Sequence, residues 1–281
     1  MQTIIVPTDF SESADNALAY ACELARALKS KIVLFHTYEL PVLATDYPVL
    51  PVTAQEMKVE IRNALNKTKE KFKAVFPELD FAVETVIGSV DREINHAISK
   101  HNVHYVVMGT RGVSGVGEIL VGTNAASVME HADCPVIVVP ANAKFEGLKK
   151  IVLAADYGEH NYEHAENAID FAKVFNAEVA LLHVSKGDSD DTFEESELMV
   201  FKNRLVERQK YNSIITVLVN DFDAFHGINT FIEEYKAELL IVSMRSRTLL
   251  QKVFSRSLTK RMAYHSHIPV MALHISNKRE K

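Results

Sequence analysis

The chain has 281 residues, of which 47% are hydrophobic and 24% are charged, and its formal net charge is −6. This composition is that of an ordinary globular protein, and the length allows two domains of about 140 residues each. The negative charge argues against a nucleic acid or an anionic membrane surface as the main partner. The two cysteines, Cys22 and Cys134, exclude a disulfide framework and fit a reducing compartment.

The chain begins with MQTIIVPTDFSESA, which lacks the basic n-region and the long apolar segment of a signal peptide. No apolar run approaches the roughly 20 residues that a membrane helix needs. We therefore expect a cytoplasmic protein without a membrane partner.

Short apolar runs alternate with longer helical patterns in the first half. The runs are rich in Val and Ile, as in parallel strands that are buried on both faces, and cover 3–8, 31–37, 81–87, 104–109 and 135–139. Ser11 or Ser13 can cap the first helix, and Thr123 the fourth. The inward-facing positions of the four expected helices are, in chain order, Leu18, Cys22, Ala25 and Leu28; Met57, Ile61, Leu65 and Phe72; Ile94 and Ile98; Val128 and Met129.

The second half repeats the first. IIVPTDF (4–10) resembles IVLAADY (151–157), and KIVLFHT (31–37) resembles EVALLHV (178–184), with one offset, because 156 − 9 = 147 and 183 − 36 = 147. HADCPVIVV and HSHIPVMAL match at a different offset, 265 − 131 = 134. The difference places extra residues in the first half, at the proline-containing stretch 38–57, which we expect to form a flap beside a ligand.

This pattern predicts two tandem domains, 1–142 and 148–281, joined through the polar linker 140–150. Alternating strands and helices indicate a doubly wound α/β sheet, in which ligands bind at the carboxyl ends of the strands. The acidic stretch 188–197 is expected to form a solvated, mobile loop.

Five of the ten glycines lie in MGTRGVSGVGEILVGT, residues 108–123, between an expected strand and an expected helix. Such a cluster needs a reason, for example positive φ or the close approach of a ligand. The spacing Gly109-x2-Gly112-x9-Gly122-Thr123 is neither a Walker loop nor the dinucleotide fingerprint. Backbone N–H groups at a helix N-terminus favour phosphate, so the loop is interpreted as a phosphate cradle; an exposed flexible loop is the alternative.

The whole chain resembles the universal stress protein family, and specifically its tandem, ATP-binding members. The likeness rests on IIVPTDFSESADNAL, LFHTYE, VIGSVDREI, the glycine motif and the closing CPVIVVP. It implies Rossmann-like domains of the adenine nucleotide alpha hydrolase type, each with a five-stranded parallel sheet flanked by helices. It also implies a stress-response regulatory module that binds ATP and Mg²⁺. The nucleotide-binding residues that the likeness implies are Pro7, Thr8, Asp9, Thr37, Met108, Gly109, Arg111, Gly112, Gly122, Thr123 and Asn124.

Several alternatives remain open at this stage. Asp9 can instead cap a helix entry, and Arg111 can be a surface residue. A slow ATPase or phosphotransferase, or a scaffold without nucleotide, are alternatives to the regulatory module; no catalytic residue is identified, because no lysine or general base aimed at the γ-phosphate is recognisable. His160 and His164 are four residues apart, but no third ligand has the right spacing, so no metal site is expected.

The second copy is expected to bind no ATP. At the 134-residue offset, Ser243, Ser246, Arg256 and Ser257 replace Gly109, Gly112, Gly122 and Thr123. The basic loop 245–261 could attract another anion or an acidic partner. The family likeness further implies that the last strands, 135–139 and 269–273, pair within the chain; a homodimer and an unknown protein partner are also considered.

Overall fold

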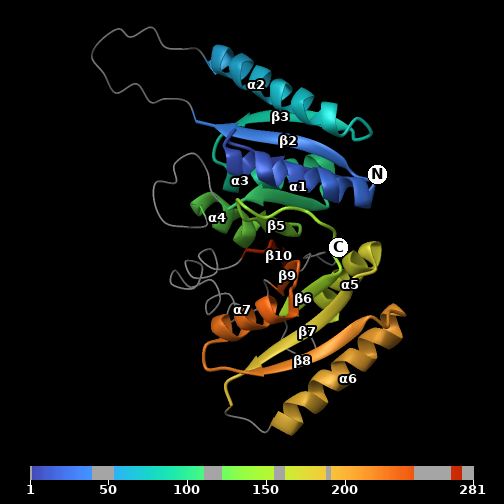
Figure 1. Ribbon diagram of the computed structural model, residues 1–281. Helices are drawn as coiled ribbons and strands as arrows, with labels where there is room; N and C mark the ends of the chain where they lie inside the picture. The colour runs from blue at the N-terminus through green and yellow to red at the C-terminus, as the bar shows by residue number, and fades with distance from the viewer. Residues whose placement is uncertain are drawn as a thin grey trace, which may run out of the picture.

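The computed structural model describes residues 2–39, 54–110, 122–154, 162–187, 191–243 and 267–273 (Figure 1). The described strands are β1 (Thr3–Pro7), β2 (Lys31–Tyr38), β3 (Phe81–Ile87), β4 (Tyr105–Gly109), β5 (Val136–Val139), β6 (Lys150–Ala154), β7 (Glu178–Ser185), β8 (Ile214–Asn220), β9 (Leu239–Ser243) and β10 (Val270–Leu273). The described helices are α1 (Glu12–Leu28), α2 (Ala54–Val75), α3 (Val90–His101), α4 (Thr123–His131), α5 (Tyr162–Phe175), α6 (Asp191–Gln209) and α7 (Ala224–Tyr235).

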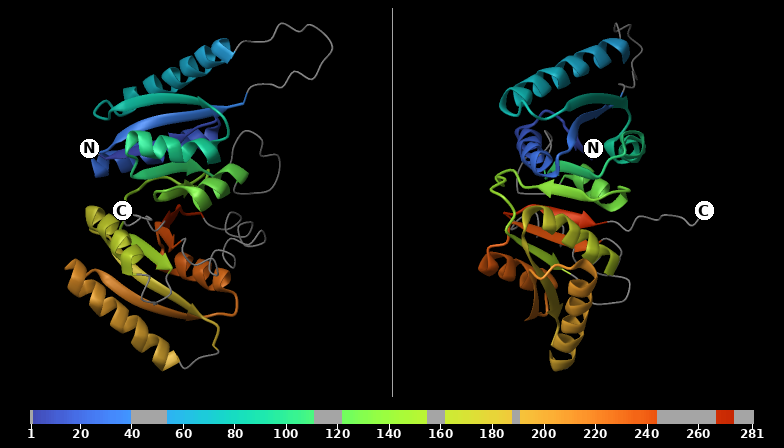
Figure 2. Two further views of the ribbon diagram at one scale, coloured as in Figure 1. Left: turned by 180° about the vertical axis from the view of Figure 1, so that it is seen from behind. Right: turned by 90° about the vertical axis from the view of Figure 1, so that its right-hand side faces the viewer.

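The described strands form a single ten-stranded sheet in the order β3-β2-β1-β4-β5-β10-β9-β6-β7-β8. Strands are parallel within each half, whereas β5 and β10 pair antiparallel, with Ile137 opposite Met271. The expected pairing of the last strands is therefore confirmed. Figure 2 shows the two halves joined end to end through these strands, with β3 and β8 at opposite ends of the molecule.

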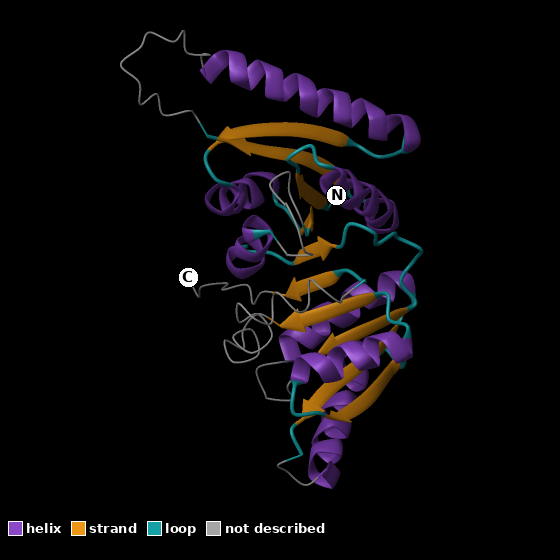
Figure 3. Cartoon of the chain, turned by 60° about the vertical axis from the view of Figure 1, so that its left-hand side comes forward, coloured by secondary structure: helices purple, strands orange, loops and turns teal. Residues whose placement is uncertain are grey.

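Helices cover both faces of the sheet (Figure 3). Alternate strand residues point to opposite faces, so Ile4 belongs to one buried cluster and Ile5 to the other. The first cluster contains buried residues of α1, α2, α5 and α6, and the second those of α3, α4 and α7. This arrangement confirms the predicted α/β architecture and explains why the strands are apolar at successive positions.

Of the three predictions that concern helix starts, the structure confirms one and contradicts two. Ser11 is the N-cap of α1, and its side chain accepts a hydrogen bond from the Ala14 N–H, as predicted. Thr123 was predicted as the cap of α4, and this is wrong: Gly122 is at the cap position, and Thr123 is the first helical residue. The predicted loop 188–197 is also wrong from Asp191 onward, where α6 begins, because acidic residues favour the positive end of a helix.

The predicted flap, 38–57, falls mostly outside the described residues. Its first residue, Tyr38, ends β2, and its last four belong to α2, which begins at Ala54. Among the described helices, none combines the length and the hydropathy needed to cross a membrane.

The linker between the halves is tied to both. The Asn16 side-chain amide of α1 donates hydrogen bonds to the carbonyls of Pro140 (3.0 Å) and Ala143 (2.9 Å). The Phe145 ring lies 5.1 Å from that of Tyr20 in α1 and 6.1 Å from that of Phe175 in α5. The linker thus packs as part of the first buried cluster.

Candidate functional site

A cavity of about 260 Å³ lies at the carboxyl ends of β1, β2 and β4. The chain runs from β1 outward to β2 and β3 and then returns to the other side of β1 as β4, so the strand order reverses between β1 and β4. Parallel α/β sheets bind ligands at such a switch point, because the loops that leave the two strands diverge there. The cavity therefore occupies the position that the fold class predicts for a ligand.

The cavity brings together most of the residues that the sequence predicted. Nine of them line it: Pro7, Thr8, Asp9, Thr37, Met108, Gly109, Gly122, Thr123 and Asn124. The other two, Arg111 and Gly112, lie outside the described residues. Thr37 lies inside β2, and Met108 is the last residue but one of β4.

Six further residues line the cavity without having been predicted: Ala14, Phe35, His36, Val90, Thr110 and Ala125. Phe35, His36, Thr110 and Ala125 lie next to or near a predicted position, whereas Ala14 belongs to α1. Val90 begins α3 directly after the turn that follows β3, so this turn reaches the site as well. The sequence signal that could have found them is the general rule that every strand end at this edge contributes to the site.

The N-terminus of α4, which lines the cavity, has N–H groups without an acceptor in the helix. The first intrahelical bond runs from the Ala126 N–H to the Gly122 carbonyl (3.1 Å). The N–H groups of Thr123, Asn124 and Ala125 therefore have no acceptor within the helix, and no side chain caps it. The first turn of α4 also carries no acidic residue. Three donors and the positive end of the helix dipole together favour an anion here.

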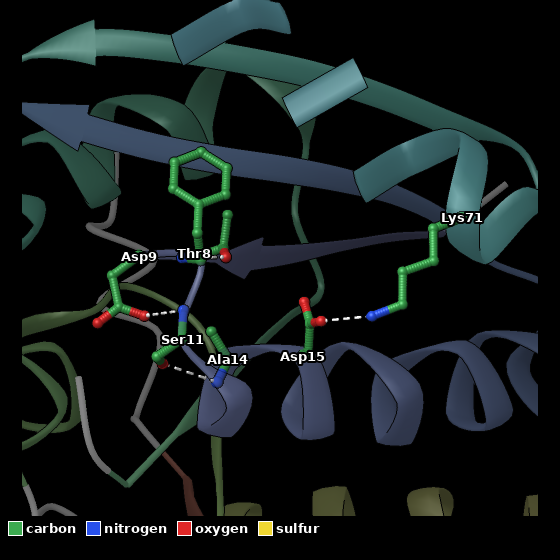
Figure 4. A network of polar contacts seen from close by, with 7 residues as sticks. Thr8, Asp9, Ser11, Ala14, Asp15 and Lys71 are labelled. Atoms are coloured by element: carbon green, nitrogen blue, oxygen red, sulfur yellow. Dashed lines mark hydrogen bonds and ion pairs between the residues drawn. The ribbon is translucent and has the colours of Figure 1, made fainter. Parts of the chain in front are cut away.

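The N-terminus of α1, at the same edge, is capped by the side chains of the turn that precedes it, as Figure 4 shows. Asp9 Oδ1 accepts from the Ser11 N–H (3.1 Å), and Ser11 Oγ accepts from the Ala14 N–H (3.1 Å). Farther along α1, Asp15 forms an ion pair with Lys71 of α2 at 2.6 Å. One oxygen of Asp9 thus caps the turn that enters α1, which is the alternative role that the sequence left open for this residue. Its side chain also lines the cavity.

The two glycines that line the cavity, Gly109 and Gly122, differ in what surrounds them. Neither has positive φ. A Cβ at Gly109 would lie 2.6 Å from Ser13 Oγ and 2.8 Å from the Ser13 carbonyl oxygen, so glycine lets α1 pack against β4. A Cβ at Gly122 would meet only the Thr110 carbonyl oxygen, at an ordinary 3.6 Å. Among the described neighbours nothing requires glycine at position 122.

His36 links two walls of the cavity. Its Nδ1 lies 2.6 Å from the Thr8 carbonyl oxygen, an acceptor, so Nδ1 carries the proton and donates. The Phe10 ring lies 4.8 Å from the imidazole, and Phe10 itself has φ of +65°. The Phe10 N–H donates to Thr8 Oγ1 (3.0 Å). His36 and Thr8 thus hold the turn between β1 and α1 in one shape.

The lining is nearly neutral. Asp9 is the single carboxylate among the described lining residues, and none of them is Lys or Arg. No cluster of three or more His, Cys, Asp or Glu side chains suited to a metal occurs in the described part of the chain.

Burial raises the pKa of the Cys22 and Cys134 thiols to about 12, so both stay protonated at neutral pH. Neither cysteine is a nucleophile in this fold.

The corresponding edge of the second half is described only in part. Ser243 ends β9 at the position that Gly109 has in β4, and it is buried. Its Oγ has no hydrogen-bond partner among the described atoms. The positions that correspond to Gly112, Gly122, Thr123 and Asp9 lie outside the described residues.

The architecture and cavity define a class: an α/β protein of two repeated halves, with a candidate ligand site at the switch point of the first. The sequence matches the universal stress protein family over residues 1–140 and 147–274. The chain therefore belongs to this family and carries two universal stress protein domains in tandem.

Individual relatives agree with this assignment. The chain is 26% identical to a universal stress protein of Mycolicibacterium smegmatis over 286 residues, which covers 96% of both chains. It is 31% identical to universal stress protein YxiE of Bacillus subtilis, which matches 48% of this chain and 97% of YxiE. The crystal structure of a universal stress protein from Archaeoglobus fulgidus DSM 4304 superposes with a TM-score of 0.75 at 19% identity, over 97% of this chain and 98% of that one. The last likeness concerns the fold alone.

Proposed function

We propose that the protein binds ATP with Mg²⁺ in the cavity of its first half and acts as a stress-response regulatory module. The observation that carries the proposal is the open N-terminus of α4, where the N–H groups of Thr123, Asn124 and Ala125 face the cavity without an acceptor in the helix. Triphosphate oxygens would supply these acceptors. Gly122, which no described neighbour requires, leaves room for their approach.

The remaining walls fit a nucleoside. Pro7, Phe35, Val90 and Met108 offer an apolar surface for a base, while Asp9 and the hydroxyl of Thr37 can accept and donate hydrogen bonds at its edge or at the ribose. The cavity volume of about 260 Å³ is just below the usual range for small-molecule sites, about 300–1,000 Å³. Since Thr123 and Asn124 are exposed, the phosphate end opens to solvent and the triphosphate can extend outward.

Mg²⁺ fits the site through the nucleotide. This ion keeps several waters and is usually bound by phosphate oxygens plus one or two protein oxygens, so it needs no protein cage. Asp9 and the Thr123 hydroxyl are the oxygen groups in the cavity wall that would hold it.

Calorimetric titration of the full chain with Mg·ATP tests the proposal. In Gly122→Val, two extra methyl groups enter the space where phosphate would lie, so we expect the affinity to fall by about 100-fold or more. Thr123→Val is the matched control, since it removes the hydroxyl but keeps the N–H donors, and should weaken binding by only about 10-fold. Unchanged affinity in Gly122→Val would overturn the cradle.

The same titration addresses the second half and the alternative of an enzyme. We expect one ATP per chain, because Arg256 and Ser257 replace Gly122 and Thr123. We also expect turnover far below the enzyme median of roughly 10 per second, since no described lining residue is Lys or Arg. A rate near that median, abolished by Gly122→Val, would make the protein an ATPase.

A further inference from the structure

A second cavity of about 260 Å³ lies along the free edge of β3, away from the candidate nucleotide site. Three elements build its walls: α2 provides Lys58 and Arg62, β3 provides Glu84 and Thr85, and the end of α3 provides Lys100 and His101. No described strand continues the sheet beyond β3, so outward-pointing N–H groups of this strand have no strand partner there.

The charges in this cavity do not cancel. Glu84 is satisfied within the protein, by Lys100 Nζ at 2.5 Å and by the His101 ring. Burial alone would raise the pKa of Glu84, but the hydrogen bonds from Lys100 and His101 outweigh it and lower the pKa, so the carboxylate stays ionised. Lys58 and Arg62 have no ion-pair partner among the described residues. Two exposed cations therefore line the cavity without an ion-pair partner in the part of the chain that the structure describes.

A polar group inside the cavity wall is also unsatisfied. Thr85 Oγ1 is buried and has no hydrogen-bond partner in the described structure. A hydroxyl in this state is uncommon, because buried polar atoms nearly always find a partner. Thr85 lines the same cavity as Lys58 and Arg62, and an acceptor with negative charge would satisfy all three donors.

The second half provides an internal comparison. Leu65 and Phe72, buried in α2, correspond to Leu198 and Leu205, buried in α6, since 198 − 65 = 133 and 205 − 72 = 133. By the same correspondence, Asp191 and Glu195 occupy the positions of Lys58 and Arg62.

The other two walls also differ in charge: the helix carries an acid in place of a cation, and the strand carries an apolar residue in place of an acid. Ile94 and Ile98 of α3 correspond to Ile228 and Ile232 of α7, which places Glu234 at the position of Lys100. Strand pairing places Val217 and Leu218 at the positions of Glu84 and Thr85. The fold thus accepts acids at all three cationic positions, so the cations of the first half are not required for folding.

We propose that the cavity at the β3 edge, with the uncompensated Lys58 and Arg62 around the buried Thr85 hydroxyl, binds a tetrahedral oxyanion of the phosphate type. Arg62 offers the planar N–H pair that matches two phosphate oxygens, Lys58 adds a point charge, and Thr85 Oγ1 donates a third hydrogen bond. Lys100 and His101 hold Glu84 and keep its charge from repelling the anion. The ligand is inorganic phosphate or the phosphate group of a small metabolite.

The test is calorimetric titration of the full chain with inorganic phosphate and with phenyl phosphate, at low ionic strength. Arg62→Glu installs the residue type of the second half, and its fold is checked by thermal melting. Lys67→Glu makes the same kind of charge change at an exposed position of α2 outside the cavity. Gly122→Val closes the cradle of the nucleotide site, so phosphate binding that survives in it belongs elsewhere.

In the Gly122→Val background, where the cradle is closed to phosphate, we expect phosphate affinity to fall by about 10-fold or more with Arg62→Glu and to change little with Lys67→Glu. Tighter binding of phenyl phosphate would assign a phosphorylated metabolite, and equal or weaker binding would assign free phosphate. Absence of phosphate binding to the unaltered chain, or equal loss in Arg62→Glu and Lys67→Glu, would overturn the proposal. So would self-association that is lost in Arg62→Glu without any phosphate binding, since the edge would then meet the acidic edge of another copy.

Discussion

Replacing each cavity glycine by alanine separates packing from ligand binding. In Gly109→Ala the new Cβ would lie 2.6 Å from Ser13 Oγ and 2.8 Å from the Ser13 carbonyl oxygen, distances that real contacts do not tolerate. The first turn of α1 must move away from β4, and overpacking of this kind costs about 1–3 kcal/mol. In Gly122→Ala the nearest described atom is at 3.6 Å, so no movement is needed.

Thermal unfolding of the two variants measures this difference. A loss of 2–3 kcal/mol lowers the melting temperature of a chain of this size by about 4–10 °C, and this is the result expected for Gly109→Ala. Gly122→Ala should cost no more than about 1 kcal/mol, the usual cost of alanine at an N-cap. Its effect should appear instead as weaker ATP binding.

The reverse pattern would refute this reasoning. If Gly109→Ala melted like the unaltered protein, α1 and β4 would be packed less tightly than the distances at Gly109 indicate. If Gly122→Ala lost several kcal/mol, its glycine would serve the fold, and the case for a ligand at this position would lose its main support.

Three further results are expected. Cys22 and Cys134, whose thiol pKa is raised to about 12, should resist a thiol reagent at pH 8 in the native protein and react after denaturation. Ser11→Ala should cost about 1 kcal/mol in urea unfolding, by removing the cap of α1. Because the pKa of Glu84 is lowered in the folded protein, its ionised form stabilises the fold above the pKa of an unfolded glutamate, about 4.3. This stability is lost as pH falls through the folded pKa. In Glu84→Gln the free energy of unfolding should therefore fall less steeply with decreasing pH in the acid range.

Much of the fold follows from the sequence because its signals are local and repeated. Val and Ile at successive positions, as in 31–37, occur where both faces of a strand are buried, and β2 indeed has four consecutive buried residues. Ile94 and Ile98 are spaced for one face of a helix, and both are buried in α3. The start of α6 was missed because its acidic first turns carry little apolar pattern, although such residues suit a helix N-terminus.

Most residues of the candidate site could be predicted from the sequence, but the structural role of each residue could not. Gly109 and Gly122 look alike in the motif, yet only the structure shows a close approach of Ser13 at the first and an ordinary contact with the Thr110 carbonyl oxygen at the second. His36 was not among the predicted site residues, yet it donates to the Thr8 carbonyl and lines the cavity. Contacts between residues distant in sequence set these roles, and no local pattern encodes them.

The linker offers a test of how strongly the two halves depend on each other. Phe145 contacts Tyr20 of the first half and Phe175 of the second, and packs against the shared buried cluster. Phe145→Ala should remove about 2–3 kcal/mol, somewhat less than a fully buried phenylalanine. Phe222→Ala is the matched control, since that ring is 86% exposed and its loss should change little.

Calorimetric unfolding distinguishes two consequences of that loss. Because β5 and β10 continue one sheet through both halves, we expect the unaltered chain to unfold in a single transition. Phe145→Ala leaves this strand pairing and the contact between Tyr105 and Phe171 in place but removes the two ring contacts of the linker, so the transition should shift to lower temperature and broaden or split. An unshifted transition in Phe145→Ala, equal to that of Phe222→Ala, would show that the linker ring does not help to join the halves.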